Sequence, residues 1–125
     1  GHHKHSEYLI SNSEIFGLNS EDIAIISNVA RYHRKTLPAR THGNFARLAR
    51  EHRLVVLKLA GILRVADALD RSHAARITRF TVELCEDEMI LHCDIDGDIS
   101  VEQFSMHRKS DLFEQVFGLR VVVSR

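Results

Sequence analysis

Hydrophobic positions recur at helical spacing through the first part of the chain and at strand spacing after it. Apolar residues three or four positions apart predict helices over residues 2 to about 12, 20 to about 35 and 50 to about 72. Beyond residue 75, apolar and polar residues alternate, which predicts a two-stranded hairpin. A helix from Ser100 to Gly118 and a strand over residues 119–124 follow it. We therefore expect an α+β chain, with an all-helical lobe over residues 1–74 and a small ββαβ lobe over residues 75–125.

Two of the expected helices carry an apolar stripe that we predict to face the core. The second helix begins at an N-cap residue, either Asn19 or Ser20. Its stripe consists of Ile23, Ile26, Val29, Ala30 and His33, so we expect the His33 side chain to face inward. In the third helix the stripe is broader and consists of Val55, Leu59, Ile62, Leu63, Ala66 and Leu69.

The hairpin and the two cysteines can be placed by pairing alternate residues. If Glu86 and Asp87 form the turn, strand pairing puts Leu84 beside Met89, Val82 beside Leu91 and Phe80 beside Cys93. Cys85 then lies on the opposite face from Cys93, so we expect two free thiols. Free thiols and the lack of a secretory signal pattern favour the cytoplasm, and no apolar stretch is long enough to span a membrane.

The chain is neutral overall, but its charges are segregated. It has 125 residues with 17 basic and 17 acidic side chains, and ordinary globular proportions of 44% hydrophobic and 27% charged residues. Residues 1–30, 31–79 and 80–125 carry net charges of −3, +9 and −6. A central segment this basic predicts an anionic partner, or else salt bridges to the acidic last third.

Histidine and aspartate side chains on three helices form a candidate metal site. A histidine of the first helix, His2 or His5, joins His33 and Asp67, and this set of nitrogen and oxygen donors suits Mn, Fe or Zn. Taken alone, each of these side chains is better explained as a hydrogen-bonded core or edge residue. The histidine-rich start is also explained as the remainder of an affinity tag.

Three ordered segments carry a resemblance to a known family. They are His2-His-Lys-His-Ser-Glu-Tyr-Leu-Ile10, Arg31-Tyr-His-Arg-Lys35 and Leu63-Arg-Val-Ala-Asp-Ala-Leu-Asp70. Together they resemble the C-terminal region of the exopolyphosphatase and guanosine pentaphosphate phosphatase family, and the stretch from Arg108 to Gly118 resembles the final lobe of that region. The helical part resembles the HD phosphohydrolase fold.

The resemblance implies a supporting part of a larger enzyme. The family's catalytic groups belong to actin-like N-terminal domains, which this chain lacks, so we expect it to be inactive alone. The whole enzyme would use Mg or Mn to release terminal phosphate from inorganic polyphosphate or the 5′ phosphate from guanosine pentaphosphate. In HD domains a His-Asp pair also holds the metal, and this chain has no such pair. Compared with HD domains, the chain therefore keeps only a residual part of the metal site, which consists of His2 or His5, together with His33 and Asp67.

The role implied for this region is polyphosphate binding, dimerisation or regulation. Arg53, Arg64 and Arg71 fall on one edge of the third helix, in a row about 27 Å long that would suit a repeating phosphate polyanion. Alternatively, these arginines pair with the acidic C-terminal lobe. Two other functions stay open, namely a free-standing metal-dependent HD phosphohydrolase and a basic binding module without catalysis.

Overall fold

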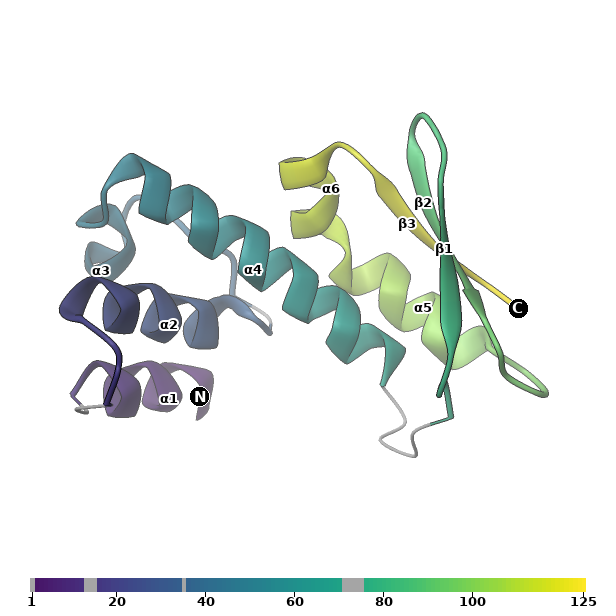
Figure 1. Ribbon diagram of the computed structural model, residues 1–125, viewed down its shortest axis with the longest axis horizontal. Helices are drawn as coiled ribbons and strands as arrows, with labels where there is room; N and C mark the ends of the chain where they lie inside the picture. Colours follow the sequence, from purple (N-terminus) through teal and green to yellow (C-terminus); the bar gives the residue numbers. More distant parts are fainter. Residues whose placement is uncertain (1, 13–15, 35, 71–75) are drawn as a thin grey trace. The chain divides into compact units, whose positions relative to one another are not determined.

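A computed structural model describes residues 2–12, 16–34, 36–70 and 76–125 of the chain. Helices dominate its first part and a small sheet its last part (Figure 1). The elements in chain order are α1 (His2–Ser11), α2 (Ser20–Tyr32), α3 (Gly43–Ala46), α4 (Arg50–Leu69), β1 (Phe80–Leu84), β2 (Glu88–Cys93), α5 (Ser100–Lys109), α6 (Asp111–Phe117) and β3 (Arg120–Ser124). The predicted α+β class, with a helical part followed by a small sheet, is confirmed.

The chain divides into two compact units, which we describe separately. Unit 1 is Gly1–Ala60 and unit 2 is Gly61–Arg125. The division falls inside α4, whereas the boundary expected at residues 74 and 75 lies outside the described residues. The physical reason for the earlier division is that Val65 and Ala68, in the second half of α4, belong to the hydrophobic core of unit 2.

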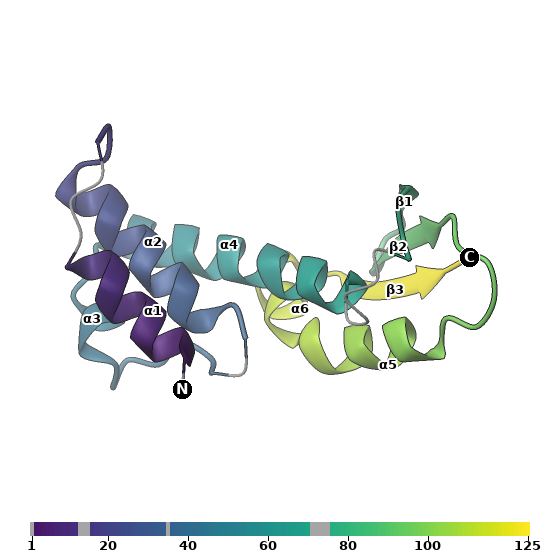
Figure 2. The ribbon, with the colours of Figure 1, turned by 90° about the horizontal axis from the view of Figure 1, so that it is seen from below.

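In unit 1, α1 and α2 lie side by side (Figure 2). The predicted cap of α2 is confirmed: the Asp22 N–H donates to Asn19 Oδ1 at 2.8 Å, and the Asn19 N–H donates to Asp22 Oδ2 at 3.1 Å. This reciprocal capping box satisfies backbone donors that the helix leaves unpaired. The helix ends at Tyr32, three residues earlier than expected, and His33 is its C-cap.

The buried face of α2 differs from the predicted apolar stripe. Asn28, Val29 and Tyr32 are buried, whereas Ile26 is 38% exposed and His33 is only half-buried. Tyr32 is fully buried and takes the inward position that we expected for His33. The helix is therefore rotated toward its polar side, where the Asn28 amide nitrogen donates to the Ala24 carbonyl at 2.8 Å and the Tyr32 hydroxyl lies 2.7 Å from His42 Nδ1.

The apolar stripe predicted for α4 is also wrong. Val55, Leu59, Ile62 and Leu63 are 39–47% exposed, and only Leu69 of the large members packs against the core of unit 2. The buried positions of α4 are Val56, Ala60, Gly61, Arg64, Val65 and Ala68. Three of these six residues are alanine or glycine, and at Gly61 the neighbouring backbone approaches closely. A Cβ atom at Gly61 would lie 3.3 Å from Phe113 Cα.

The sheet of unit 2 has the order β1-β2-β3, with β1 antiparallel and β3 parallel to β2. The predicted hairpin register is confirmed, because Phe80 pairs with Cys93, Val82 with Leu91 and Leu84 with Met89. Both cysteines are free, and Cys85 is exposed while Cys93 is buried, as the register requires. Burial and, secondarily, the Glu102 carboxylate raise the pKa of the Cys93 thiol.

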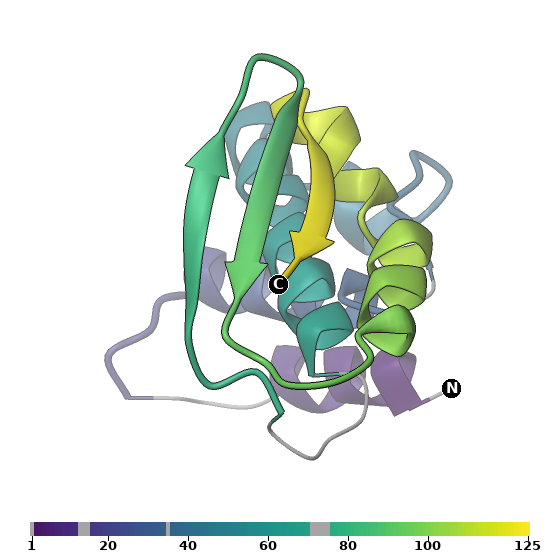
Figure 3. The same ribbon diagram turned by 90° about the vertical axis from the view of Figure 1, so that its right-hand side faces the viewer.

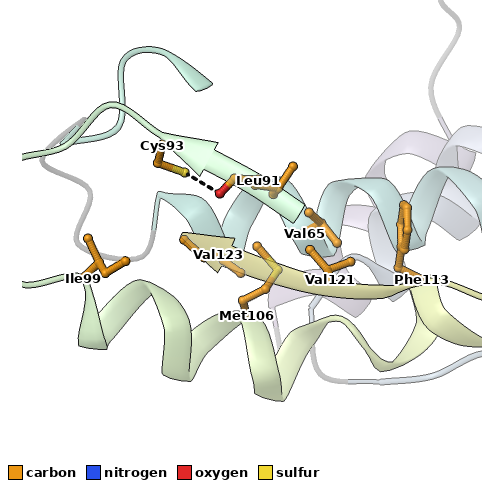
Figure 4. Packing of buried hydrophobic residues seen from close by; sticks show 9 residues of the cluster. Val65, Leu91, Cys93, Ile99, Met106, Phe113, Val121 and Val123 are labelled. Atoms are coloured by element: carbon orange, nitrogen blue, oxygen red, sulfur yellow. Dashed lines mark hydrogen bonds between the residues drawn. The ribbon is translucent and has the colours of Figure 1, made fainter. Parts of the chain in front are cut away.

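Unit 2 has its core between the sheet and α4, α5 and α6. Val65 of α4, Leu91 and Val123 of the sheet and Met106 of α5 belong to this core, and the Cys93 Sγ lies 3.6 Å from the Leu91 carbonyl oxygen (Figure 4). The single helix predicted from Ser100 to Gly118 is two helices, which meet at Ser110. Gly118 ends the second one in the left-handed conformation, with φ of 70°, which glycine adopts without a Cβ penalty.

Candidate basic site

Unit 1 contains a stretch rich in exposed cations, which we call the basic segment, residues 40–58. It includes the end of the loop before α3, all of α3 and the first half of α4. Its exposed cations are Arg40, Arg47, Arg50 and Lys58, and its one acidic residue is Glu51. Sequence reasoning missed Arg40, Arg47, Arg50 and Lys58 because it followed one edge of a helix, although the central charge of +9 already indicated this region.

Arg53 holds the turn between α3 and α4 in place. One guanidinium nitrogen, NH1, donates to the Leu48 carbonyl at 2.6 Å and to the Ala46 carbonyl at 3.4 Å. These carbonyls lie where α3 ends, where an arginine can satisfy acceptors that the helix leaves unpaired. Arg53 therefore positions Arg47 and Arg50, the exposed arginines on each side of this turn.

Arg64 lies in the interior of unit 2. It is 4% exposed, and its NH2 group is 3.3 Å from Asp111 Oδ1. Asp111 opens α6, where a carboxylate also interacts favourably with the helix dipole. This burial counts against Arg64 as a ligand for an extended polyanion and agrees with pairing to the acidic lobe. Arg71 lies outside the described residues, so the row of three stays a prediction.

Two of the predicted metal ligands, His33 and Asp67, have other partners in the structure. His5 is exposed on α1, His33 Nδ1 lies 2.6 Å from the Ala30 carbonyl oxygen, and Lys109 Nζ bonds the Asp67 carboxylate. The His2 side chain lies outside the described part of the chain. Among the described residues, no three His, Cys, Asp or Glu side chains could share a metal ion. An ammonium group on Asp67 does not fit metal ligation, so we derive no chemistry through a metal.

A line of polar and aromatic contacts connects the first helices of unit 1. Glu7 of α1 is 4% exposed, and its Oε1 lies 3.8 Å from Arg31 NH1. The Arg31 guanidinium lies over the Tyr32 ring, 5.4 Å from its centre, a cation–π geometry. The Tyr32 hydroxyl is 2.7 Å from His42 Nδ1, and the two rings are stacked. These contacts join two of the three family-like segments, so their characteristic residues serve packing between helices.

Burial of Tyr32 makes its ionisation a probe of this packing. Burial, with a smaller opposing contribution from Arg31, raises the pKa of Tyr32 from 10 to about 12. The folded state therefore holds the phenol proton more tightly than the unfolded state does. The stability that this provides is complete below pH 10 and is lost as the pH rises to about 12.

We expect a Tyr8→Phe variant, in which Tyr32 is the one remaining tyrosine, to show a phenolate absorbance midpoint near pH 12. Its free energy of unfolding should fall between pH 10 and about pH 12. The same fall in a Tyr8→Phe/Tyr32→Phe variant would show that groups other than Tyr32 cause it. A midpoint near pH 10 before any unfolding would show that Tyr32 is open to water.

With the fold and the basic segment established, the chain is an α+β protein with a basic helical unit. Its sequence matches the family model described as "Ppx/GppA phosphatase, domain III" over residues 1–115. The chain belongs to the Ppx/GppA phosphatase family, and the resemblance to the C-terminal region of these phosphatases is confirmed. Within the described ranges, none of the helices has both the length and the apolar character needed to cross a membrane.

Proposed function

We propose that this chain is a non-catalytic domain of an exopolyphosphatase-type phosphohydrolase that binds a phosphate polyanion through its basic segment. The whole enzyme would release terminal phosphate from inorganic polyphosphate or the 5′ phosphate from guanosine pentaphosphate. The observation that supports the binding role is the exposure of Arg40, Arg47, Arg50 and Lys58 with a single acidic residue among them.

The two arginines beside the α3–α4 turn are the strongest part of this surface. Arg47 is the C-cap of α3 and Arg50 is the first residue of the 20-residue helix α4. A cation at a helix N-terminus is disfavoured by the dipole, so Arg50 does not stabilise α4. A bound phosphate would offset this repulsion and would accept bidentate hydrogen bonds from the guanidinium groups. A repeating polyanion can occupy several such groups at once, which favours polyphosphate over a ligand with one phosphate.

The test is a titration with long-chain polyphosphate at two salt concentrations. We expect a triple variant, Arg40→Gln/Arg47→Gln/Arg50→Gln, to bind at least about tenfold more weakly than the wild type. Its affinity should also depend less steeply on salt, because fewer counterions are released. The charge-matched control, Arg79→Gln/Arg108→Gln/Arg120→Gln, removes three exposed arginines from unit 2. Equal losses of affinity in the two triple variants would mean that binding depends only on net charge. That result would overturn the assignment to the basic segment.

The remaining features of the proposal follow from the family. We propose that the helical unit is HD-like in fold but holds polyanion rather than carrying out metal chemistry, and that Mg or Mn acts elsewhere in the whole enzyme. The actin-like domains of that enzyme would be the partner that performs hydrolysis. A cytoplasmic location goes with this proposal and is supported by the two free thiols.

A further inference from the structure

The short helix α3 depends on contacts outside itself. It has four residues, and a helix of that length makes too few hydrogen bonds to offset the cost of forming its first turn. The Ala46 N–H donates to the His42 carbonyl at 2.9 Å, and the Arg47 N–H donates to the Gly43 carbonyl at 3.1 Å. Phe45 is the side chain of α3 that is buried. The elements that α3 contacts therefore determine whether it forms and where it lies.

Tyr32 of α2 contacts this region at two points. Its hydroxyl lies 2.7 Å from Nδ1 of His42, the N-cap of α3, and the two rings are stacked with their centres 5.6 Å apart. Tyr32 also meets Phe45 edge to face, with ring centres 5.8 Å apart. Tyr32 is fully buried, so the packing around α2 fixes its own position.

A second residue of α2, one turn before Tyr32, lies against the same helix. Asn28 is 1% exposed, and its amide nitrogen lies 3.5 Å from the Asn44 carbonyl oxygen of α3. The two helices α2 and α3 are therefore in contact within unit 1 (Figure 1). Arg53 holds the other end of α3 through its hydrogen bonds to the carbonyls of that turn. The basic segment is thus fastened by α2 on one side and by Arg53 on the other.

We propose that Tyr32 is a positioning residue that holds Arg40 and Arg47 in place for a phosphate polyanion. Arg40 lies two residues before His42, and Arg47 is the C-cap of α3, so both flank the stretch that Tyr32 contacts. Both arginines are exposed. Because Tyr32 is buried and uncharged, it acts through α3 and not by touching the ligand. This inference rests on the proposed function, since it concerns the same surface.

The contribution of Tyr32 to binding is preorganisation. A polyanion that binds side chains on a mobile backbone must order that backbone, and the cost of ordering lowers its affinity. When α3 is already formed, the ligand orders only the guanidinium side chains. Loss of the Tyr32 hydroxyl would leave every cation in the chain but would transfer part of the ordering cost to the binding step. Affinity should therefore fall while its salt dependence stays the same.

Amide hydrogen exchange tests the anchor without any ligand. Tyr32→Phe keeps the ring contacts and removes the hydroxyl. We expect the amides of Ala46 and Arg47 to exchange about fivefold faster in this variant, because a hydrogen bond that resists local opening is lost. β2, the central strand of the sheet in unit 2, is the internal reference and should keep its wild-type exchange rates (Figure 3). The matched control is Tyr8→Phe on α1, a side chain that is 64% exposed, and it should change neither set of amides.

A titration with long-chain polyphosphate tests the positioning role. We expect Tyr32→Phe to bind about fivefold more weakly than the wild type, with an unchanged salt dependence because no cation is removed. A variant that removes arginines loses affinity and salt dependence together, so the two kinds of defect can be told apart. His42→Phe should weaken binding to a similar extent. The double variant Tyr32→Phe/His42→Phe should lose less than the sum of the two single losses, because each single substitution already breaks their shared hydrogen bond.

Three results would overturn the positioning role. Unchanged exchange of the α3 amides in Tyr32→Phe would show that the hydroxyl does not hold α3. Faster exchange with unchanged polyphosphate affinity would show that the order of α3 does not matter for binding. Additive losses in the double variant would show that Tyr32 and His42 act separately. A wild type that fails to bind polyphosphate would instead overturn the proposed function and the positioning role with it, and the exchange measurement needs no polyphosphate, so these failures are distinguishable.

Discussion

Replacing Arg76 with methionine should lower the free energy of unfolding by about 3 kcal/mol. Glu102 is fully buried, and its Oε1 accepts a hydrogen bond from Arg76 NH1 at 2.9 Å. The second arm of the same guanidinium donates to the Asp98 carbonyl at 2.8 Å. Methionine keeps the packing of the aliphatic stem but leaves a buried carboxylate without its cation, which costs far more than a lost surface contact.

The matched control is Arg79→Met, three residues along the chain. Arg79 pairs with Asp94 at 3.2 Å, but the side chains are 83% and 68% exposed, so its loss should change stability by less than about 0.5 kcal/mol. Urea unfolding followed by circular dichroism measures both variants. Adding Glu102→Met to Arg76→Met should recover much of the lost stability. Equal effects of the two single variants would contradict a buried ion pair.

Replacing Gly61 with leucine should destabilise unit 2 by about 2 to 3 kcal/mol. A Cβ atom at this position would lie 3.3 Å from Phe113 Cα and 3.4 Å from Phe113 N, and both are backbone atoms. The rest of a leucine side chain cannot fit without separating α4 from α6. The better helix propensity of leucine, worth about 0.8 kcal/mol, only partly offsets this cost.

The control for this variant is Ala66→Leu on the same helix, at an exposed position. It adds the same side chain where there is space, so its stability should stay within about 0.5 kcal/mol of the wild type. Urea unfolding of the two variants compares the sites directly. A Gly61→Leu protein as stable as the Ala66→Leu protein would mean that α4 and α6 do not pack closely.

The sequence predicted the hairpin of unit 2 correctly because a strict alternation leaves little freedom of register. With Glu86 and Asp87 as the turn, every pair follows, including the separation of Cys85 from Cys93. The cap of α2 was equally local, since Asn19 and Asp22 are three residues apart and satisfy each other. Local chemistry determines both features.

The buried face of α4 could not be predicted in the same way. Its large aliphatic residues form a clear stripe, and a stripe normally identifies the core side of a helix. In α4 the buried face is instead the one that carries Ala60, Gly61 and Ala68, and at Gly61 the backbone of Phe113 comes too close for a larger side chain. Which side of a helix meets its neighbours depends on the shape of those neighbours, and the pattern of one helix does not contain that information.

The candidate site shows the same limit. The charge segregation indicated a basic region and an acidic last third, but it could not say which arginines would find acidic partners. Arg64 meets Asp111, 47 residues away, and Asp67 meets Lys109, 42 residues away. Such contacts remove predicted ligands from solvent, while Arg40, Arg47 and Arg50 of the basic segment stay exposed.

The most direct test of the binding role without catalysis is one titration of end-labelled, long-chain polyphosphate with this chain, in the presence of Mg or Mn. Released orthophosphate is measured in the same samples. We predict saturable binding that weakens as salt is added, with no orthophosphate above the protein-free control. Failure to bind polyphosphate at low salt would contradict the proposed function, and so would steady release of orthophosphate from the bound chain.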